Sequence, residues 1–191
     1  MRAMKIRKII SGGQTGVDRA ALDVAMRHGI DHGGWIPKRR RAENGILPKK
    51  YELDEMSTTS YPKRTEKNIL ESDGTLIVSY GKLTGGSALT RKLAKKHGRP
   101  WLHIDLFRIQ RMDAVRIVRG WLERNEIEVL NVAGPRASKG PGIYGETVEL
   151  LSGVLGVYTP IDPIPSYITE APGLFYPVCK NFKVDGQWAC A

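Results

Sequence analysis

The sequence has few cysteines, few aromatic side chains and no long run of apolar residues. Its 191 residues contain two cysteines, Cys179 and Cys190. Two cysteines are too few for a disulfide framework, and no histidines stand at zinc-site spacing, so we interpret both as free thiols. No segment approaches the roughly 18 apolar residues of a membrane helix, and the N-terminus lacks the apolar run of a signal peptide. We therefore expect a soluble cytoplasmic protein with no membrane association.

Positive charge and apolar residues are plentiful. The 30 lysines and arginines exceed the 20 acidic residues, which gives a formal net charge of +10. This excess predicts an anionic partner, either a phosphorylated metabolite, a cofactor or a nucleic acid. Aromatic residues make up 7% of the chain and no nucleic-acid-binding motif is present, which disfavours a nucleic acid. The 41% of apolar residues can bury the core of one domain.

Short apolar runs alternate with amphipathic stretches, the pattern of an α/β fold with a doubly wound parallel sheet of about five strands. The predicted strands are residues 6–11, 32–36, 75–79, 101–105 and 129–132. The predicted helices are residues 17–28, 65–71, 87–97, 113–124 and 145–155. The basic connection over residues 37–50 is expected to lack regular structure. We expect a ligand-binding domain over residues 1–157 and a proline-rich C-terminal extension over residues 158–191.

Three of the loops that follow predicted strands are rich in glycine. They span residues 11–16, 81–90 and 131–144. In an open parallel sheet, ligands bind beyond the carboxyl ends of the strands, where glycines and helix N-termini present N–H groups to anions. The first loop matches neither the G-x-G-x-x-G fingerprint nor a P-loop, so dinucleotide oxidoreductase and P-loop chemistry are not indicated. Together the loops predict a phosphate-binding cleft.

Several side chains near these loops can be interpreted either as structural residues or as ligand contacts. The run from Lys38 to Arg41 is either a solvated face or a contact for the ligand. The Asp18 carboxylate is either stabilised by the helix dipole alone or also contacts the ligand. Ser87 could serve only as a helix cap. The histidines, including His103 inside a predicted strand, have ordinary structural explanations and pair with no recognisable nucleophile or metal motif.

The first glycine loop belongs to a longer recognisable segment. Residues 12–23 read GGQTGVDRAALD and, with GWIPK at 34–38 and AENG at 42–45, closely resemble the molybdenum carrier family, which is related to molybdenum-cofactor carrier proteins. Residues 65–68, 72–77, 83–90 and 131–136 extend the resemblance to about residues 5–157. The sequence departs from the family at Arg39, where glycine is usual, and at Asn44, where aspartate is usual.

The resemblance implies a Rossmann-like fold of the superfamily that includes the lysine-decarboxylase-like phosphoribohydrolases and the DNA-processing protein of natural transformation. It implies binding of the molybdenum cofactor (molybdopterin), a pterin with a terminal phosphate, or of a nucleotide. It also implies a homo-oligomer, dimer or tetramer, and molybdoenzymes as recipients of the cargo. We assign no catalytic residue and no metal ligand. The expected cofactor-binding residues are Gly12, Gly13, Gln14, Thr15, Gly16, Asp18, Arg19, Lys38, Thr84, Gly85, Gly86, Ser87, Thr90, Gly134, Pro135 and Arg136.

Two alternatives to a carrier stay open. The first is a nucleotide-binding protein or a nucleotide N-glycosidase, because the phosphoribohydrolases have a catalytic glutamate after their glycine loop. Residues 81–100 contain no acidic residue, which leaves Asp18, Asp73 and Glu146 as the acid–base candidates near the cleft. The second alternative is nucleic-acid binding, which would show a steep dependence on salt.

Overall fold

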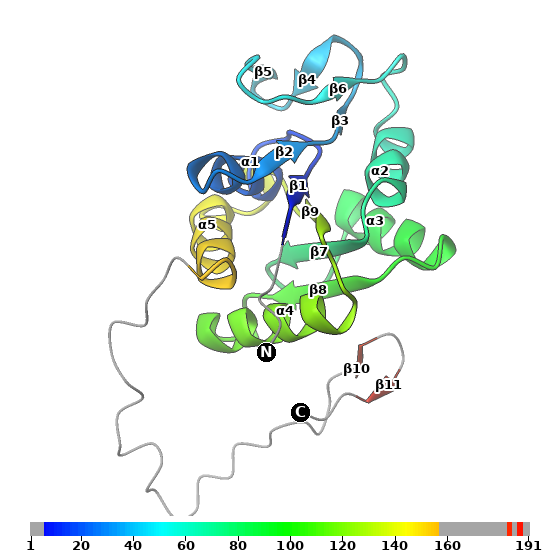
Figure 1. Ribbon diagram of the computed structural model, residues 1–191. Coiled ribbons are helices and arrows are strands. Elements are labelled where there is room, and N and C mark those ends of the chain that lie inside the picture. The colour runs from blue at the N-terminus through cyan, green and yellow to red at the C-terminus, as the bar shows by residue number, and fades with distance from the viewer. Residues whose placement is uncertain (1–5, 157–182, 185–186, 189–191) are drawn as a thin grey trace, which may run out of the picture.

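The computed structural model describes residues 6–156, 183–184 and 187–188, and its centre is a five-stranded parallel sheet (Figure 1). Its strands lie in the order β2-β1-β9-β7-β8, and each neighbouring pair is parallel. This arrangement confirms the predicted fold class. The strands are β1 (Lys8–Ile10), β2 (Asp31–Gly33), β7 (Gly74–Ser79), β8 (Trp101–Asp105) and β9 (Val129–Ala133).

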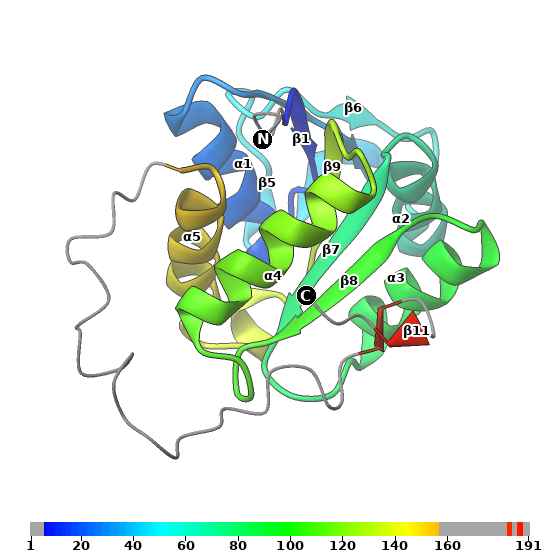
Figure 2. The ribbon, with the colours of Figure 1, turned by 60° about the horizontal axis from the view of Figure 1, so that its bottom comes forward.

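Helices cover both faces of the sheet, as a doubly wound fold requires (Figures 1 and 2). Helices α1, α4 and α5 lie on one face, and α2 and α3 lie on the other. Three of the helices begin two residues earlier than predicted. The helices are α1 (Val17–Arg27), α2 (Tyr61–Leu70), α3 (Gly85–Lys96), α4 (Arg111–Arg124) and α5 (Ile143–Val154).

The main core lies between the sheet and the layer of α1, α4 and α5. All six residues of β7 are buried, as expected for an inner strand of a parallel sheet. Leu76 and Val78 from β7 and Trp121 from α4 belong to this core, and each is 0% exposed. A smaller apolar cluster packs the segment after β2 against α1, and its residues are Leu22, Ile36, Leu47, Tyr51 and Leu53.

The predicted strand at residues 32–36 is divided in the structure. Gly34 has φ of 114°, and a Cβ atom there would lie 2.4 Å from the Ser11 carbonyl oxygen. The chain therefore turns away from the main sheet after β2. The continuation, β3 (Trp35–Ile36), instead pairs in parallel with β6 (Asp54–Glu55).

The connection over residues 37–50 was expected to be irregular, and that expectation was wrong. It contains a 3₁₀ turn, Lys38–Arg40, and a small hairpin of β4 (Arg41–Ala42) and β5 (Gly45–Ile46). Helix α2 also begins four residues before its predicted start. Ser60 caps it by accepting a hydrogen bond from the Lys63 N–H at 3.4 Å.

Most of the C-terminal extension lies outside the described residues, including Cys179 and Cys190. Two short strands, β10 (Lys183–Val184) and β11 (Gln187–Trp188), form an antiparallel pair there. The domain boundary at residue 157 stays a prediction. Within the described part of the chain, no helix has both the length and the apolarity needed to cross a membrane.

Candidate anion-binding site

The three glycine-rich loops leave the same edge of the sheet. They follow β1, β9 and β7, which are consecutive in the strand order, so the loop after β9 lies between the other two. The helix after β1 goes to one face and the helix after β7 goes to the other, so the strand order reverses here. This is the position at which doubly wound folds bind their ligands.

The loops after β1 and β9 are in direct contact. The Val17 N–H donates to the Pro135 carbonyl at 3.4 Å, and the Ala137 N–H donates to Thr15 Oγ1 at 3.1 Å. Gly16 has φ of 76°, and a Cβ atom there would lie 2.5 Å from the Pro135 carbonyl oxygen. Only glycine fits at this position, because a side chain would clash with the backbone of the neighbouring loop.

Glu43, from the β4–β5 hairpin, bridges these two loops. Its carboxylate accepts hydrogen bonds from the hydroxyls of Thr15 and Ser138. The hydrogen bonds from Ser138 and Thr15 hold the pKa of Glu43 below its usual value. Sequence reasoning did not place Glu43 in the site, although it stands in the matched segment at 42–45.

A buried ion pair lies behind the first glycine loop. Arg64 Nη1 is 3.8 Å from Asp18 Oδ2, and the side chains are 11% and 7% exposed. The Gln14 N–H donates to the same Asp18 oxygen at 3.3 Å. Burial raises the pKa of Asp18, and the nearby Arg64 partly opposes that rise. Burial also lowers the pKa of Arg64.

Arg64 is a site residue that sequence reasoning missed. Its guanidinium occupies the space beside Gly12, since a Cβ atom there would lie 1.7 Å from Arg64 Nη1. The guanidiniums of Arg64 and Arg136 lie 6.0 and 5.1 Å from the centre of the Tyr61 ring. Two cations from different elements therefore flank the first loop, and no local pattern in the sequence indicates their proximity.

The loop after β7 leads into an open helix N-terminus. A Cβ atom at Gly85 or Gly86 would meet no heavy atom within 4 Å. The side chain of Thr84, the capping residue, makes no capping hydrogen bond, and the first turn of α3 carries no acidic residue. Ser87 and Thr90 are buried, and the Thr90 hydroxyl donates to the Gly86 carbonyl at 3.0 Å. The first N–H groups of α3 therefore face accessible space.

Other expected binding residues support the loops from behind. Arg19 Nη2 donates to the Gly13 carbonyl at 3.3 Å, and its guanidinium lies 4.8 Å from the Tyr51 ring centre. Gln14 is buried and its Nε2 donates to the Arg41 carbonyl at 3.1 Å. Gly134 packs tightly, since a Cβ atom there would lie 2.4 Å from the Val78 carbonyl oxygen.

The basic run from Lys38 to Arg41 is divided between solvent and the fold. The Lys38 side chain is exposed. Arg40 instead turns inward and donates hydrogen bonds to four carbonyls of its own connection. The acceptors are the carbonyl oxygens of Leu47, Pro48, Tyr51 and Leu53. Arg40 therefore holds the shape of the segment that covers the first glycine loop.

Of the three acid–base candidates, Asp73 was wrongly expected near the cleft. It precedes β7, at the opposite edge of the sheet, and accepts hydrogen bonds from the N–H groups of Glu128 and Val129 at 3.1 and 2.7 Å. Glu146 lies at the start of α5 and forms an ion pair with Arg111 at 3.1 Å. Asp18 forms the buried ion pair with Arg64.

The structure also corrects the expectation that His103 contacts no nucleophilic side chain. His103 Nε2 lies 2.8 Å from Ser79 Oγ, and burial lowers the pKa of His103. Ser79 is 4% exposed, and its single hydroxyl proton is donated to the Gly81 carbonyl at 3.0 Å. While the Ser79 hydroxyl donates to Gly81, its oxygen can accept from the tautomer of His103 that carries the proton on Nε2, and these two contacts brace the turn that starts the second glycine loop.

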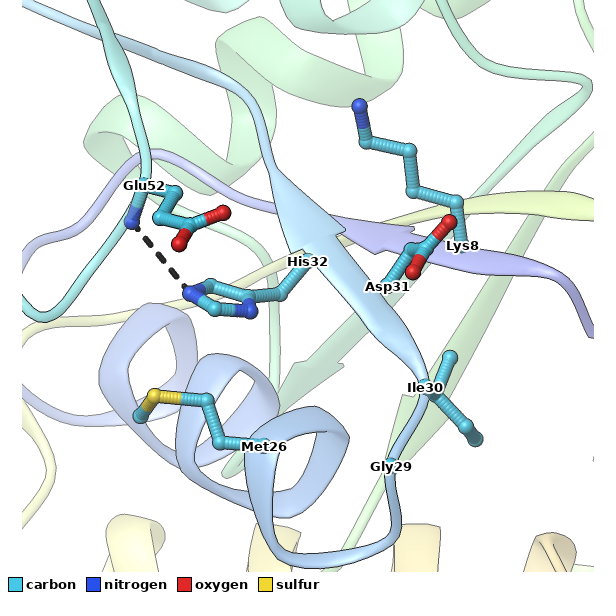
Figure 3. Close-up of a pocket in the computed structure, with 7 residues that line it drawn as sticks. All are labelled: Lys8, Met26, Gly29, Ile30, Asp31, His32 and Glu52. Atoms are coloured by element: carbon cyan, nitrogen blue, oxygen red, sulfur yellow. Dashed lines mark hydrogen bonds between the residues drawn. The ribbon is translucent and has the colours of Figure 1, made fainter.

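A pocket of about 600 Å³ lies away from these loops (Figure 3). It opens beside Lys8 and Asp31, which begin β1 and β2, and it contains none of the expected binding residues. Figure 3 shows the Glu52 N–H donating to His32 Nε2, at 3.2 Å. No described residues form a group of three or more His, Cys, Asp and Glu side chains placed to hold a metal ion.

Comparison with known proteins gives two matches. The model of the circularly permutated YpsA SLOG family matches residues 9–155. A crystal structure described as "Putative molybdenum carrier protein" from Syntrophus aciditrophicus SB is 57% identical, with a TM-score of 0.78. The match covers 78% of this chain and 95% of that one. No curated protein matches the sequence. The chain therefore belongs to the circularly permutated YpsA SLOG family and has its Rossmann-like fold.

Proposed function

We propose that this protein binds and carries an anionic, phosphate-bearing cofactor at the glycine-rich edge of its sheet, with the molybdenum cofactor as the cargo. The observation that carries the proposal is the open N-terminus of α3, which presents uncapped N–H groups at the same edge of the sheet as the first glycine loop. Two arginines lie near that first loop, Arg64 of α2 and Arg136 of the loop after β9. The related protein described as a molybdenum carrier supports the identity of the cargo.

The terminal phosphate is best accommodated at α3. Gly85 and Gly86 leave room for an anion to approach the backbone, and the positive end of the helix dipole favours it. The first glycine loop is less open to a phosphate than its sequence suggests. The carboxylates of Asp18 and Glu43 already accept hydrogen bonds from Gln14, Thr15 and Ser138 there.

Arg136 is the cation best placed for a second anionic group of the cargo. It is half-buried near Tyr61 and belongs to the loop between the other two. Arg64 Nε and Gln14 Oε1 are buried and have no hydrogen-bond partner among the described residues. Buried polar atoms are nearly always paired, so a bound molecule or water would complete this region.

The proposal includes a cytoplasmic location, a homo-oligomeric state and molybdoenzymes as recipients. A nucleotide is the second candidate ligand, because the same N-terminus of α3 suits any phosphate ester. The site supports a catalytic function less well than it supports binding. Asp18 is held by Arg64, and Glu43 is held by two hydroxyls, so neither carboxylate is free for proton transfer.

Cargo analysis tests the proposal. The protein is purified gently from its own or a related host, and its molybdenum is measured by elemental mass spectrometry. Released small molecules are identified by liquid chromatography and mass spectrometry. We expect molybdenum and a pterin near one per chain. A nucleotide without metal would replace the carrier reading with nucleotide binding or hydrolysis.

A variant of the α3 N-terminus tests the location of the site. Gly86→Val places a branched side chain where no atom now lies, so the fold is kept and the approach to the N–H groups is blocked. We expect loss of the retained cargo with an unchanged circular dichroism spectrum. Gly120→Val on α4, where a Cβ atom would meet only the flexible end of Arg124, is the control. Equal retention in both variants would remove α3 from the site.

A further inference from the structure

Two aromatic rings stand beside the second glycine loop. Tyr80 follows β7 and Phe107 follows β8, and their rings stack with centroids 4.9 Å apart and planes 20° apart. Phe107 is 76% exposed. Strand β8 pairs in parallel with β7 (Figure 2), so the turn that follows β8 lies at the same carboxyl edge as the loop that leads from β7 into α3.

Backbone hydrogen bonds fix this pair relative to the loop. Asp105 Oδ1 accepts from the Gly81 N–H at 2.7 Å and from the Phe107 N–H at 3.0 Å. The Leu106 N–H donates to the Ser79 carbonyl at 2.9 Å. One carboxylate therefore holds both the start of the glycine loop and the turn that carries Phe107. A ring held in this way loses little conformational freedom when it contacts a ligand.

The rings are within reach of a ligand bound at α3. A Cβ atom at Gly81 would lie 3.7 Å from the Phe107 ring. Three residues separate Gly81 from Gly85, so four steps along the chain place their Cα atoms at most about 14 Å apart. A molecule whose phosphate meets the first turn of α3 can therefore extend a ring towards Phe107.

We propose that Tyr80 and Phe107 form a stacking surface for a planar heteroaromatic ring of the phosphate-bearing ligand. This inference rests on the proposed function and adds two side chains that select for a ring. Ring stacking tolerates different heterocycles because each presents a π-face. The surface thus selects ligands that carry both a phosphate and a ring over phosphorylated sugars.

Calorimetric titration with two probes tests the inference. Adenosine monophosphate carries a ring and a phosphate, and ribose 5-phosphate carries the same sugar phosphate without the ring. We expect Phe107→Ala to weaken the binding of adenosine monophosphate by about 5-fold to 30-fold and to leave the affinity for ribose 5-phosphate unchanged. Phe107→Trp should retain the preference for the ring. Leu70→Ala, an exposed apolar side chain at the C-terminal end of α2, is the control.

The outcomes separate this inference from the proposed function. If the unmodified protein binds both probes equally, or if Phe107→Ala weakens both equally, the stacking surface is wrong and phosphate binding stands. If the unmodified protein binds neither probe, the stacking inference fails, whereas the carrier proposal is decided separately by the cargo analysis. If Phe107→Ala keeps the ring preference but changes the molar mass by light scattering, Phe107 belongs to a subunit interface and the inference is overturned.

Discussion

Glu43 links two loops of the candidate site through a single carboxylate. Its pKa lies below the ordinary value of 4.5, because Ser138 and Thr15 donate hydrogen bonds to the ionised form. A depressed pKa in the folded protein contributes stability above about pH 4.5, and that contribution is lost as the pH falls through the folded value.

We expect the free energy of unfolding of Glu43→Gln to fall less steeply than that of the unmodified protein as the pH is lowered. Urea midpoints measured between about pH 3 and pH 7 give this slope. Glu123→Gln, at an exposed position on α4, is the control and should keep the original slope. The same pH dependence in both variants would show that the bridge contributes nothing to folding.

Arg39 adopts a backbone conformation that suits glycine. Its φ is 67°, a region in which a side chain costs roughly 1 kcal/mol or more. The Arg39 N–H, which donates to Glu55 Oε1 at 2.6 Å, is kept by glycine. We therefore expect Arg39→Gly to raise the free energy of unfolding by about 0.5 to 1 kcal/mol.

Arg40 provides the matched comparison for Arg39 in the same urea titrations. Its φ is 50°, but its guanidinium donates to four carbonyl oxygens. Arg40→Gly should therefore lower the free energy of unfolding. A loss of stability in Arg39→Gly as well would show that the Arg39 side chain has an unrecognised role.

Asp18 and Arg64 depend on each other because both are buried. Asp18→Asn leaves the Arg64 guanidinium without its counter-charge, and we expect a loss of about 3 to 5 kcal/mol in the free energy of unfolding. Removing both charges with Asp18→Asn and Arg64→Met should cost less than the sum of the single changes. Additive losses in denaturant titrations would show that the pair is not coupled.

At the scale of elements, the glycine loop after β1 is covered by another segment of the chain, whereas the loop after β7 is open at the start of α3. Gly13 has φ of 70°, and a Cβ atom there would lie 2.9 Å from a Leu47 methyl and 3.0 Å from a Leu53 methyl. The segment that contains β3 to β6 therefore packs directly on the first loop. The segment contributes Ile36, Leu47, Tyr51 and Leu53 to the smaller apolar cluster, where they pack with Leu22 of α1.

We expect Gly13→Val to displace that segment and to lower the free energy of unfolding by about 3 kcal/mol or more, from strain and overpacking combined. Gly86→Val, at an open position, should change it by less than about 1 kcal/mol. Thermal unfolding of the two variants measures the contrast. Equal destabilisation would show that α3 is not open at its N-terminus.

At the scale of the whole molecule, the charge of +10 is compatible with a small anion or a nucleic acid. The two differ in counterion release. Binding of a small phosphate ester should weaken modestly with salt, whereas a nucleic acid that contacts Z phosphates would give a logarithmic slope of about −0.9Z. We expect the modest slope for adenosine monophosphate and no salt-sensitive binding of duplex DNA in titrations from about 50 to 200 mM salt. Tight duplex binding with a steep slope would favour the nucleic-acid alternative.

The sequence by itself determined the class of fold and the main strands and helices. Apolar runs and punctuating glycines placed the strands β7, β8 and β9 within a residue or two, because burial in a parallel sheet requires continuous apolar segments. It also indicated that the glycine loops share one edge, since every loop that follows a parallel strand leaves the same side. Local patterns failed at residues 37–50, where Arg40 orders the chain through distant carbonyls.

Only the tertiary structure decided which side chains meet. The insertion of β9 between β1 and β7 brings the third loop against the first, and no local pattern encodes that order. Arg64 on Gly12, Glu43 between Thr15 and Ser138, and His103 beside Ser79 are all contacts between segments far apart in the chain. Periodicity reports the faces of an element, whereas packing between elements selects the neighbours. The sequence could therefore predict an anion-binding edge but not the residues that complete it.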